Sequence, residues 1–159
     1  MKKKGTKRIK RSEIIRVTKT AAFEMAHALA NYDGPCRNIH GHSYKLAITV
    51  TGTVIKEKGD PKEGMVIDFK DIKMIMNEVV QRYDHALVLS NETQSATKTK
   101  LSSQFDKVLF VDYQPTCENL LIDIKNRLNE KLDNSYKLFS VRLDETATSY
   151  AEWYVTDNN

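Results

Sequence analysis

Residues 40–50 read His-Gly-His-Ser-Tyr-Lys-Leu-Ala-Ile-Thr-Val, and from Tyr44 onward apolar side chains alternate with polar or small ones. This period of two predicts a half-buried β-strand over residues 40–55, with one face turned toward a core. Residues 13–27 alternate in the same way, and the Asn/Asp/Gly/Pro-containing stretch 30–39 between them is typical of a loop. We therefore expect two neighbouring strands at the start of the fold.

The rest of the chain supplies two amphipathic helices and two further strands. Short apolar runs at 86–90 and 107–112 are compatible with an additional hairpin, and the Ser/Thr/Lys/Gln-rich stretch 91–106 between them is expected to be an inserted loop. The elements predicted with periodic patterns are a helix over about 68–83, a helix from Thr116, a strand over 137–145 and a strand over about 148–155. The fold class is α+β: a four-stranded antiparallel sheet with two helices on one face.

Length and composition indicate one globular domain. The chain has 159 residues, of which 40% are hydrophobic and 29% charged, which excludes disordered, collagen-like and disulfide-rich classes. No stretch approaches the roughly 20 apolar residues of a membrane span, and the basic N-terminus is not followed by the apolar segment of a secretory signal. With only two cysteines, a reducing cytoplasm is the expected compartment.

The net charge of +4 comes from the N-terminus. Seven of the 25 basic residues lie between positions 2 and 11, and the remainder of the chain carries 18 basic against 21 acidic residues. Residues 1–12 are expected to be a disordered basic tail, and residues 13–159 a single domain. Nucleic-acid binding by the tail is not favoured, because no aromatic side chains are interleaved with the charges.

Three of the four histidines gather near the first two strands. His40 and His42 are two positions apart at the start of a strand, so their side chains share the face that continues as Tyr44. His27 ends the preceding strand on its own apolar parity, so the three imidazoles can converge if the strands pair. Three histidines with an open fourth position are typical of a catalytic zinc site. The alternative is three separately hydrogen-bonded buried histidines.

Two further motifs are ambiguous on spacing alone. Cys36, four residues before His40, could be a fourth zinc ligand in a closed structural site, or a nucleophile or base with a thiolate favoured by the metal. Asp84 and His85 follow the first helix directly. A carboxylate beside an imidazole can orient it for proton transfer, but by itself this pair indicates no more than a charged helix end.

Three residues near the C-terminal half are candidates for binding a ligand. Glu145 continues the apolar parity of its strand, where a carboxylate needs a partner such as a guanidine-like edge of paired donors. Without further context, the favoured explanation is a residue in water just past the end of the strand. Thr116 and Glu118 have a simple explanation as the N-cap and first-turn acid of a helix.

Taken together, these residues resemble the 6-pyruvoyl-tetrahydropterin synthase / 6-carboxytetrahydropterin synthase family. The motifs run in family order over nearly all of residues 14–154, and the Cys-x-x-x-His-Gly-His spacing is similar to the bacterial 6-carboxytetrahydropterin synthases. The basic tail and the 91–106 insertion depart from the compact family pattern. The motifs are Phe23–His27, Cys36–His42, Val66–Phe69, Asp84–His85, Pro115–Asn119, Glu145–Thr146 and Thr148–Glu152.

The resemblance implies a tunnelling fold, in which subunits join their sheets into a barrel, commonly a homohexamer with active sites at subunit interfaces. It implies zinc (Zn²⁺) held by His27, His40 and His42. Cys36 would be the proton-transfer base, with a relay of Asp84 and His85 that can come from a neighbouring subunit. The pterin substrate would be gripped by Glu145, Thr116 and Glu118.

The implied reaction converts 7,8-dihydroneopterin triphosphate to 6-carboxytetrahydropterin, acetaldehyde and triphosphate, an early step of queuosine biosynthesis. Two alternatives stay open at this point. An enzyme of the same fold can stop at 6-pyruvoyltetrahydropterin, and a non-catalytic zinc-stabilised module could bind nucleic acid through the tail.

Overall fold

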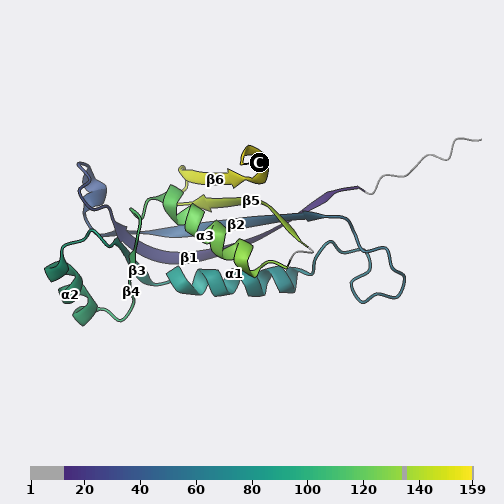
Figure 1. Ribbon diagram of the computed structural model, residues 1–159, viewed down its shortest axis with the longest axis horizontal. Coiled ribbons are helices and arrows are strands. Elements are labelled where there is room, and N and C mark those ends of the chain that lie inside the picture. Colours follow the sequence, from purple (N-terminus) through teal and green to yellow (C-terminus); the bar gives the residue numbers. More distant parts are fainter. Residues whose placement is uncertain (1–12, 134–135, 159) are drawn as a thin grey trace, which may run out of the picture.

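A computed structural model describes residues 13–133 and 136–158 (Figure 1). The predicted basic tail, residues 1–12, lies outside them. None of the described helices is long and apolar enough to cross a membrane. In chain order the elements are β1 (Ile15–Ala28), the 3-10 helix η1 (Pro35–Arg37), β2 (His40–Gly52), α1 (Phe69–Tyr83), β3 (Ala86–Ser90), α2 (Ser95–Gln104), β4 (Val108–Val111), α3 (Cys117–Lys131), β5 (Lys137–Asp144), β6 (Tyr150–Tyr154) and the 3-10 helix η2 (Val155–Asp157).

The α+β class is confirmed, but the four-stranded sheet is corrected to a sheet of six strands in the order β4-β3-β1-β2-β5-β6. The strands β1, β2, β5 and β6 pair antiparallel, as predicted. The expected hairpin of β3 and β4 is wrong, because β3 runs parallel to both β1 and β4. Parallel neighbours need a long crossover, and the stretch 91–106 provides it.

The stretch 91–106 is also not the loop that its composition indicated, because it contains α2. Thr116 and Asp68 cap the other two long helices by accepting hydrogen bonds from backbone N–H groups. Both helices bury an apolar stripe, whereas α2 buries no side chain at all. A helix without an apolar stripe leaves no periodic signal in the sequence, which explains why α2 was missed.

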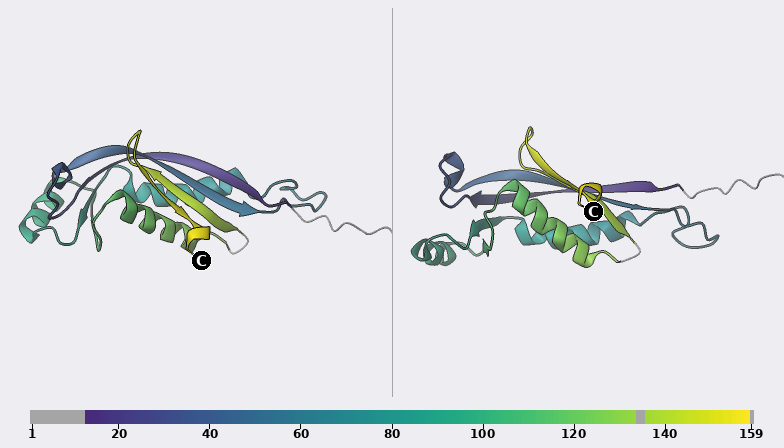
Figure 2. Two further views of the ribbon diagram at one scale, coloured as in Figure 1. Left: turned by 90° about the horizontal axis from the view of Figure 1, so that it is seen from above. Right: turned by 45° about the horizontal axis from the view of Figure 1, so that its top comes forward.

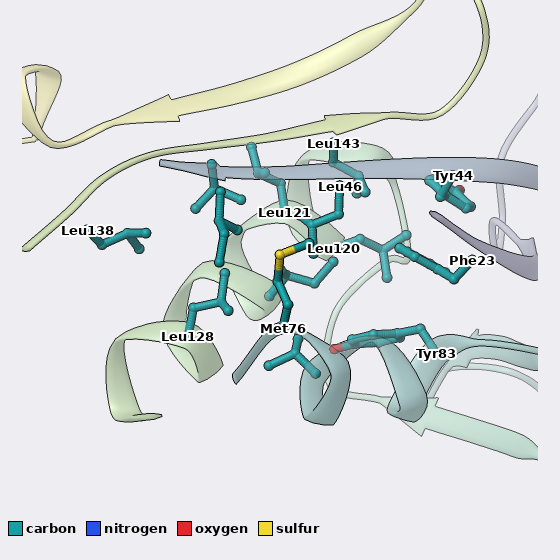
Figure 3. Close-up of a cluster of buried hydrophobic side chains, with 14 of the residues drawn as sticks. Phe23, Tyr44, Leu46, Met76, Tyr83, Leu120, Leu121, Leu128, Leu138 and Leu143 are labelled. Atoms are coloured by element: carbon teal, nitrogen blue, oxygen red, sulfur yellow. The ribbon is translucent and has the colours of Figure 1, made fainter. Parts of the chain in front are cut away.

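The core lies between the sheet and the two long helices. Figure 2 shows the sheet curving over α1 and α3, which lie side by side on one of its faces. Alternate residues of β2, including Tyr44, Leu46 and Ile48, are fully buried. Figure 3 shows Leu46 close to Met76 of α1 and Leu120 of α3. The intervening residues face the other side of the sheet. The alternation that predicted the strands therefore also decides which of their side chains reach the helix-covered face.

Candidate active site

The pairing of β1 with β2 brings three imidazoles together. His27 lies directly opposite His40 in the antiparallel register, and His42 is two residues further along the same face of β2. The ring centroid of His27 is 4.5 Å from that of His40 and 5.2 Å from that of His42. One ligand atom from each ring lies within 4.8 Å of the others. The predicted convergence of the three histidines is confirmed.

The most buried of the three, His27, has one nitrogen committed and the other open. Its Nδ1 lies 2.7 Å from the carbonyl of Pro115, and because a carbonyl can only accept, Nδ1 carries the proton. Burial lowers the pKa of the imidazole, which keeps the ring neutral. Its Nε2 is buried and has no hydrogen-bond partner among the described residues. A buried, unprotonated nitrogen without a donor is what a metal ligand requires.

His40 repeats this arrangement at the protein surface. Its Nδ1 lies 2.8 Å from the carbonyl of Asn38, so Nε2 is again the nitrogen left for coordination. Carbonyl acceptors on the second ring nitrogen are the usual orienting partners of metal-binding histidines. Three imidazoles whose ligand atoms converge fit a zinc ion with an open fourth position. Among the described residues, the group of possible ligands does not include the thiol of Cys36.

Glu145 lies beside the three histidines and is not the solvated strand end that was the simpler explanation. One of its oxygens, Oε1, accepts a hydrogen bond from the Tyr44 hydroxyl at 3.0 Å and is 3.7 Å from His27 Nε2. The side chain is 23% exposed. Burial, followed by the charge of Glu145, raises the pKa of Tyr44, so its hydroxyl remains protonated and can donate. The carboxylate is thus fixed next to the candidate metal site.

The segment before α3 connects the remaining candidates to this site. Pro115 supplies the carbonyl that orients His27, and the amide side chain of Gln114 bonds both the N–H and the carbonyl of Ala30. Thr116 is half-buried and accepts from the Asn119 N–H at 3.3 Å, whereas Glu118 is exposed in the first turn. The N-cap role expected of Thr116 is therefore present, and its position adjoins the histidines through Pro115.

The two cysteines have different environments. Cys36 lies in η1, half-buried, and its carbonyl accepts from the Leu29 N–H at 2.9 Å, which ties the loop to the end of β1. Cys117 lies at the start of α3 and donates to the Leu143 carbonyl at 3.4 Å. Burial raises the pKa of the Cys117 thiol to about 12, so it stays protonated and unreactive.

Among the described residues, Asp84 and His85 are outside the group of side chains that could hold a metal ion. Asp84 Oδ1 accepts from the Glu24 N–H at 3.0 Å, which lowers the pKa of the carboxyl group, and it lies 3.1 Å from His85 Nδ1. The His85 side chain is 78% exposed and lines a cavity of about 640 Å³ together with Glu24, Ser43 and His42. Because side chains alternate along a strand, those of Glu24 and Ser43 face the surface of the sheet opposite to the core.

Comparison with known proteins shows the family to which the chain belongs. Residues 16–155 match the model of the 6-pyruvoyl tetrahydropterin synthase family. The chain belongs to this family. It is 38% identical over 143 residues to a protein of Haemophilus influenzae named 6-carboxy-5,6,7,8-tetrahydropterin synthase, with 88% of this chain and 99% of that one covered. A Rickettsia typhi protein of the same name is 31% identical, with 87% of this chain and 99% of that one covered.

Solved structures show the same fold. The 6-pyruvoyl tetrahydropterin synthase of Caenorhabditis elegans has a TM-score of 0.66 at 24% identity, covering 91% of this chain and 97% of that one. The corresponding enzyme of Plasmodium vivax has a TM-score of 0.66 at 19% identity, covering 89% of this chain and 97% of that one. The family resemblance inferred from the motifs is confirmed by the family model and by the 38% identical relative.

Sequence reasoning missed the residues that support the site. Tyr44 was assigned to the core on its parity, and its hydroxyl partner is 101 positions away. The hydrogen-bond partner of His27 is a backbone carbonyl, which any residue could supply. Nothing in the residue type of Pro115 therefore indicated its role at the site. The role of Gln114 could not be predicted either, because its hydrogen-bond partners are backbone groups of Ala30.

Proposed function

We propose that this chain is a zinc-dependent 6-carboxytetrahydropterin synthase. It would convert 7,8-dihydroneopterin triphosphate and one water molecule to 6-carboxytetrahydropterin, acetaldehyde and triphosphate, as an early step of queuosine biosynthesis in the cytoplasm. The observation that carries this proposal is the convergence of three imidazoles beside the Glu145 carboxylate. The names of the bacterial relatives favour the same reaction over others of the fold.

The metal would be held by His27, His40 and His42, whose coordinating nitrogens are left free by the carbonyls that orient two of the rings. Zinc in that position would supply Lewis-acid polarisation of the oxygens on the substrate side chain. The protein's contribution is to fix the imidazoles in place and to keep that of His27 neutral. Burial of His27, which lowers its pKa, supports this role.

The pterin ring would be anchored by Glu145, with Thr116 and Glu118 beside it. A carboxylate can accept two parallel hydrogen bonds from the adjacent N–H and amino groups of a pterin, a strong bidentate arrangement. The Tyr44 hydrogen bond holds the carboxylate before substrate binds, so less ordering is required on binding.

Proton transfer would use Cys36 as the base and Asp84 with His85 as a relay. The exposed side chain of His85 lines a cavity, and neither residue of the pair belongs to the metal-ligand group of its own chain, so we propose that the pair serves the site of a neighbouring subunit. This supports a homo-oligomer, with a hexamer as the expected form, in which active sites lie between subunits. Its joined sheets would make the barrel of the tunnelling fold.

A second candidate function is 6-pyruvoyltetrahydropterin synthesis, which is favoured by the names of the solved structures that share the fold. The two reactions begin with the same substrate and differ in whether the side chain is cleaved. The alternative of a nucleic-acid-binding module rests on residues 1–12, which lie outside the described residues. Membership of the family favours the enzyme over this alternative.

Product analysis tests the proposal. Purified protein is incubated with 7,8-dihydroneopterin triphosphate, the pterin products are identified by mass spectrometry, and acetaldehyde is trapped as a hydrazone. We expect 6-carboxytetrahydropterin with one acetaldehyde per turnover. A product that retains the three-carbon side chain, without acetaldehyde, would instead establish the pyruvoyl reaction.

A further inference from the structure

The backbone of His85 adopts a conformation that its neighbours must maintain. Its φ is 58°, in the left-handed region that residues with side chains seldom occupy. Two contacts to β1 hold it there. The His85 N–H donates to the Glu24 carbonyl at 2.6 Å, and Asp84 Oδ1 accepts from the Glu24 N–H at 3.0 Å. These contacts attach the turn to the sheet on one side.

Lys107, just before β4, holds the same turn from the other side. Its Nζ donates to the carbonyl of Asp84 at 2.5 Å and to that of Gln81 at 2.6 Å. Carbonyls in the last turn of a helix lack intrahelical partners, and a cation there also complements the helix dipole. The Lys107 carbonyl accepts from the Leu87 N–H at 2.9 Å, so the backbone carrying this ammonium group is itself tied to β3.

The His85 imidazole has one side-chain contact, with the carboxylate of Asp84 3.1 Å from its Nδ1, so its direction depends on the Asp84–His85 turn. It is 78% exposed and lines the cavity of about 640 Å³ that Lys107 and Phe105 also line. For an exposed side chain, the backbone from which it projects decides where the ring can reach. The ammonium of Lys107 bonds the peptide that joins Asp84 to His85, so it acts on that backbone directly.

We propose that Lys107 is a positioning residue, which fixes the His85 imidazole by holding the Asp84 carbonyl and the end of α1. The proposal rests on the proposed role of Asp84 and His85 in proton transfer. It also gives the stretch 91–106 a function: the crossover through α2 returns the chain to the end of α1 and delivers Lys107 there.

The test compares Lys107→Met with a matched lysine variant. Lys98 on α2 also donates to a backbone carbonyl, that of Asn91, at 2.7 Å, but it does not contact the Asp84–His85 turn. In Lys107→Met we expect kcat to fall by about ten- to a hundred-fold, typical of a misplaced reacting group, with KM and zinc content little changed. Lys107→Arg should recover part of kcat, because arginine retains charged donors. Lys98→Met should match the wild type.

Hydrogen exchange provides a readout that does not depend on turnover. The amides between Gln81 and Val88 should exchange faster in Lys107→Met than in the wild type, and not in Lys98→Met. Wild-type kcat in Lys107→Met, or unchanged exchange in this segment, would overturn the proposal. If the wild-type protein gave no product, the proposed function would fail, and the exchange measurement alone would decide the role of Lys107. Should Lys107→Met not fold, Lys107→Gln takes its place in both measurements.

Discussion

The hydroxyl of Tyr44 donates a hydrogen bond to Glu145 Oε1 at 3.0 Å, joining residues 101 positions apart in the chain. Tyr44 is fully buried on β2, two residues after His42, and Glu145 follows β5. Because β2 pairs with β5, the bond fixes a carboxylate next to the three imidazoles. A buried tyrosine therefore links the candidate metal site to the candidate pterin anchor.

Glu145→Gln should weaken substrate binding while zinc content stays unchanged. The amide keeps the shape of the side chain but replaces one acceptor with a donor, so the bidentate pair with the pterin is lost. A hydrogen bond to a charged group contributes about 1.5–3 kcal/mol, so KM should rise by roughly ten- to a hundred-fold. Glu78→Gln, at an exposed position of α1, is the control. Unchanged affinity in Glu145→Gln would move the pterin anchor elsewhere.

Tyr44→Phe should also weaken substrate binding, but by less than Glu145→Gln does. Phenylalanine keeps the stacking of this ring on Phe23, whose centroid is 5.3 Å away, so the core should remain intact. The loss is the single bond that orients Glu145, for which about 1 kcal/mol or a roughly five-fold rise in KM is expected. The melting temperature checks the core. A variant with wild-type KM would show that Glu145 is positioned without Tyr44.

Metal analysis of the purified protein should find about one zinc per chain, as expected for a single three-histidine site. His42→Ala should lose most of it, since two imidazoles remain. His85→Ala is the matched control, because its imidazole lies outside the group of ligand atoms, and it should retain the metal. Full zinc retention in His42→Ala would refute the assignment.

Cys36→Ala should fold, keep its zinc and lose turnover. The three imidazoles suffice to hold the metal, and the thiol is outside the group of possible ligand atoms among the described residues. The readouts are thermal unfolding, zinc content and product formation, measured on the same preparation. Loss of zinc together with loss of folding would support a closed site of one cysteine and three histidines.

Mixing two inactive variants tests whether Asp84 and His85 serve a neighbouring subunit. His42→Ala and His85→Ala are unfolded together, refolded together and assayed for product. If each site combines residues of two subunits, random assembly in a symmetric oligomer should restore roughly a quarter of the sites. If both residues act within one chain, every site lacks one of them and the mixture stays inactive.

Much of the fold follows from local patterns in the sequence. The alternation in residues 13–27 and 40–55 predicted β1 and β2 and the face that each side chain takes, because successive side chains of a strand point to opposite sides. The stripes of α1 and α3 were equally visible. Pairing direction was not, since the short apolar run of β3 is compatible with either, and α2 has no apolar stripe to reveal the crossover.

In the candidate active site, too, some relations follow from local sequence patterns and others do not. From the sequence alone, His40 and His42 share a face and His27 can join them, because these relations depend only on strand period and on one pairing. Only the tertiary structure decided that Tyr44 and Pro115 support this cluster, and that His85 lies outside the group of possible metal ligands. Those relations depend on contacts across long separations, many of them to backbone groups, and a backbone N–H or carbonyl leaves no mark on the identity of the residue that carries it.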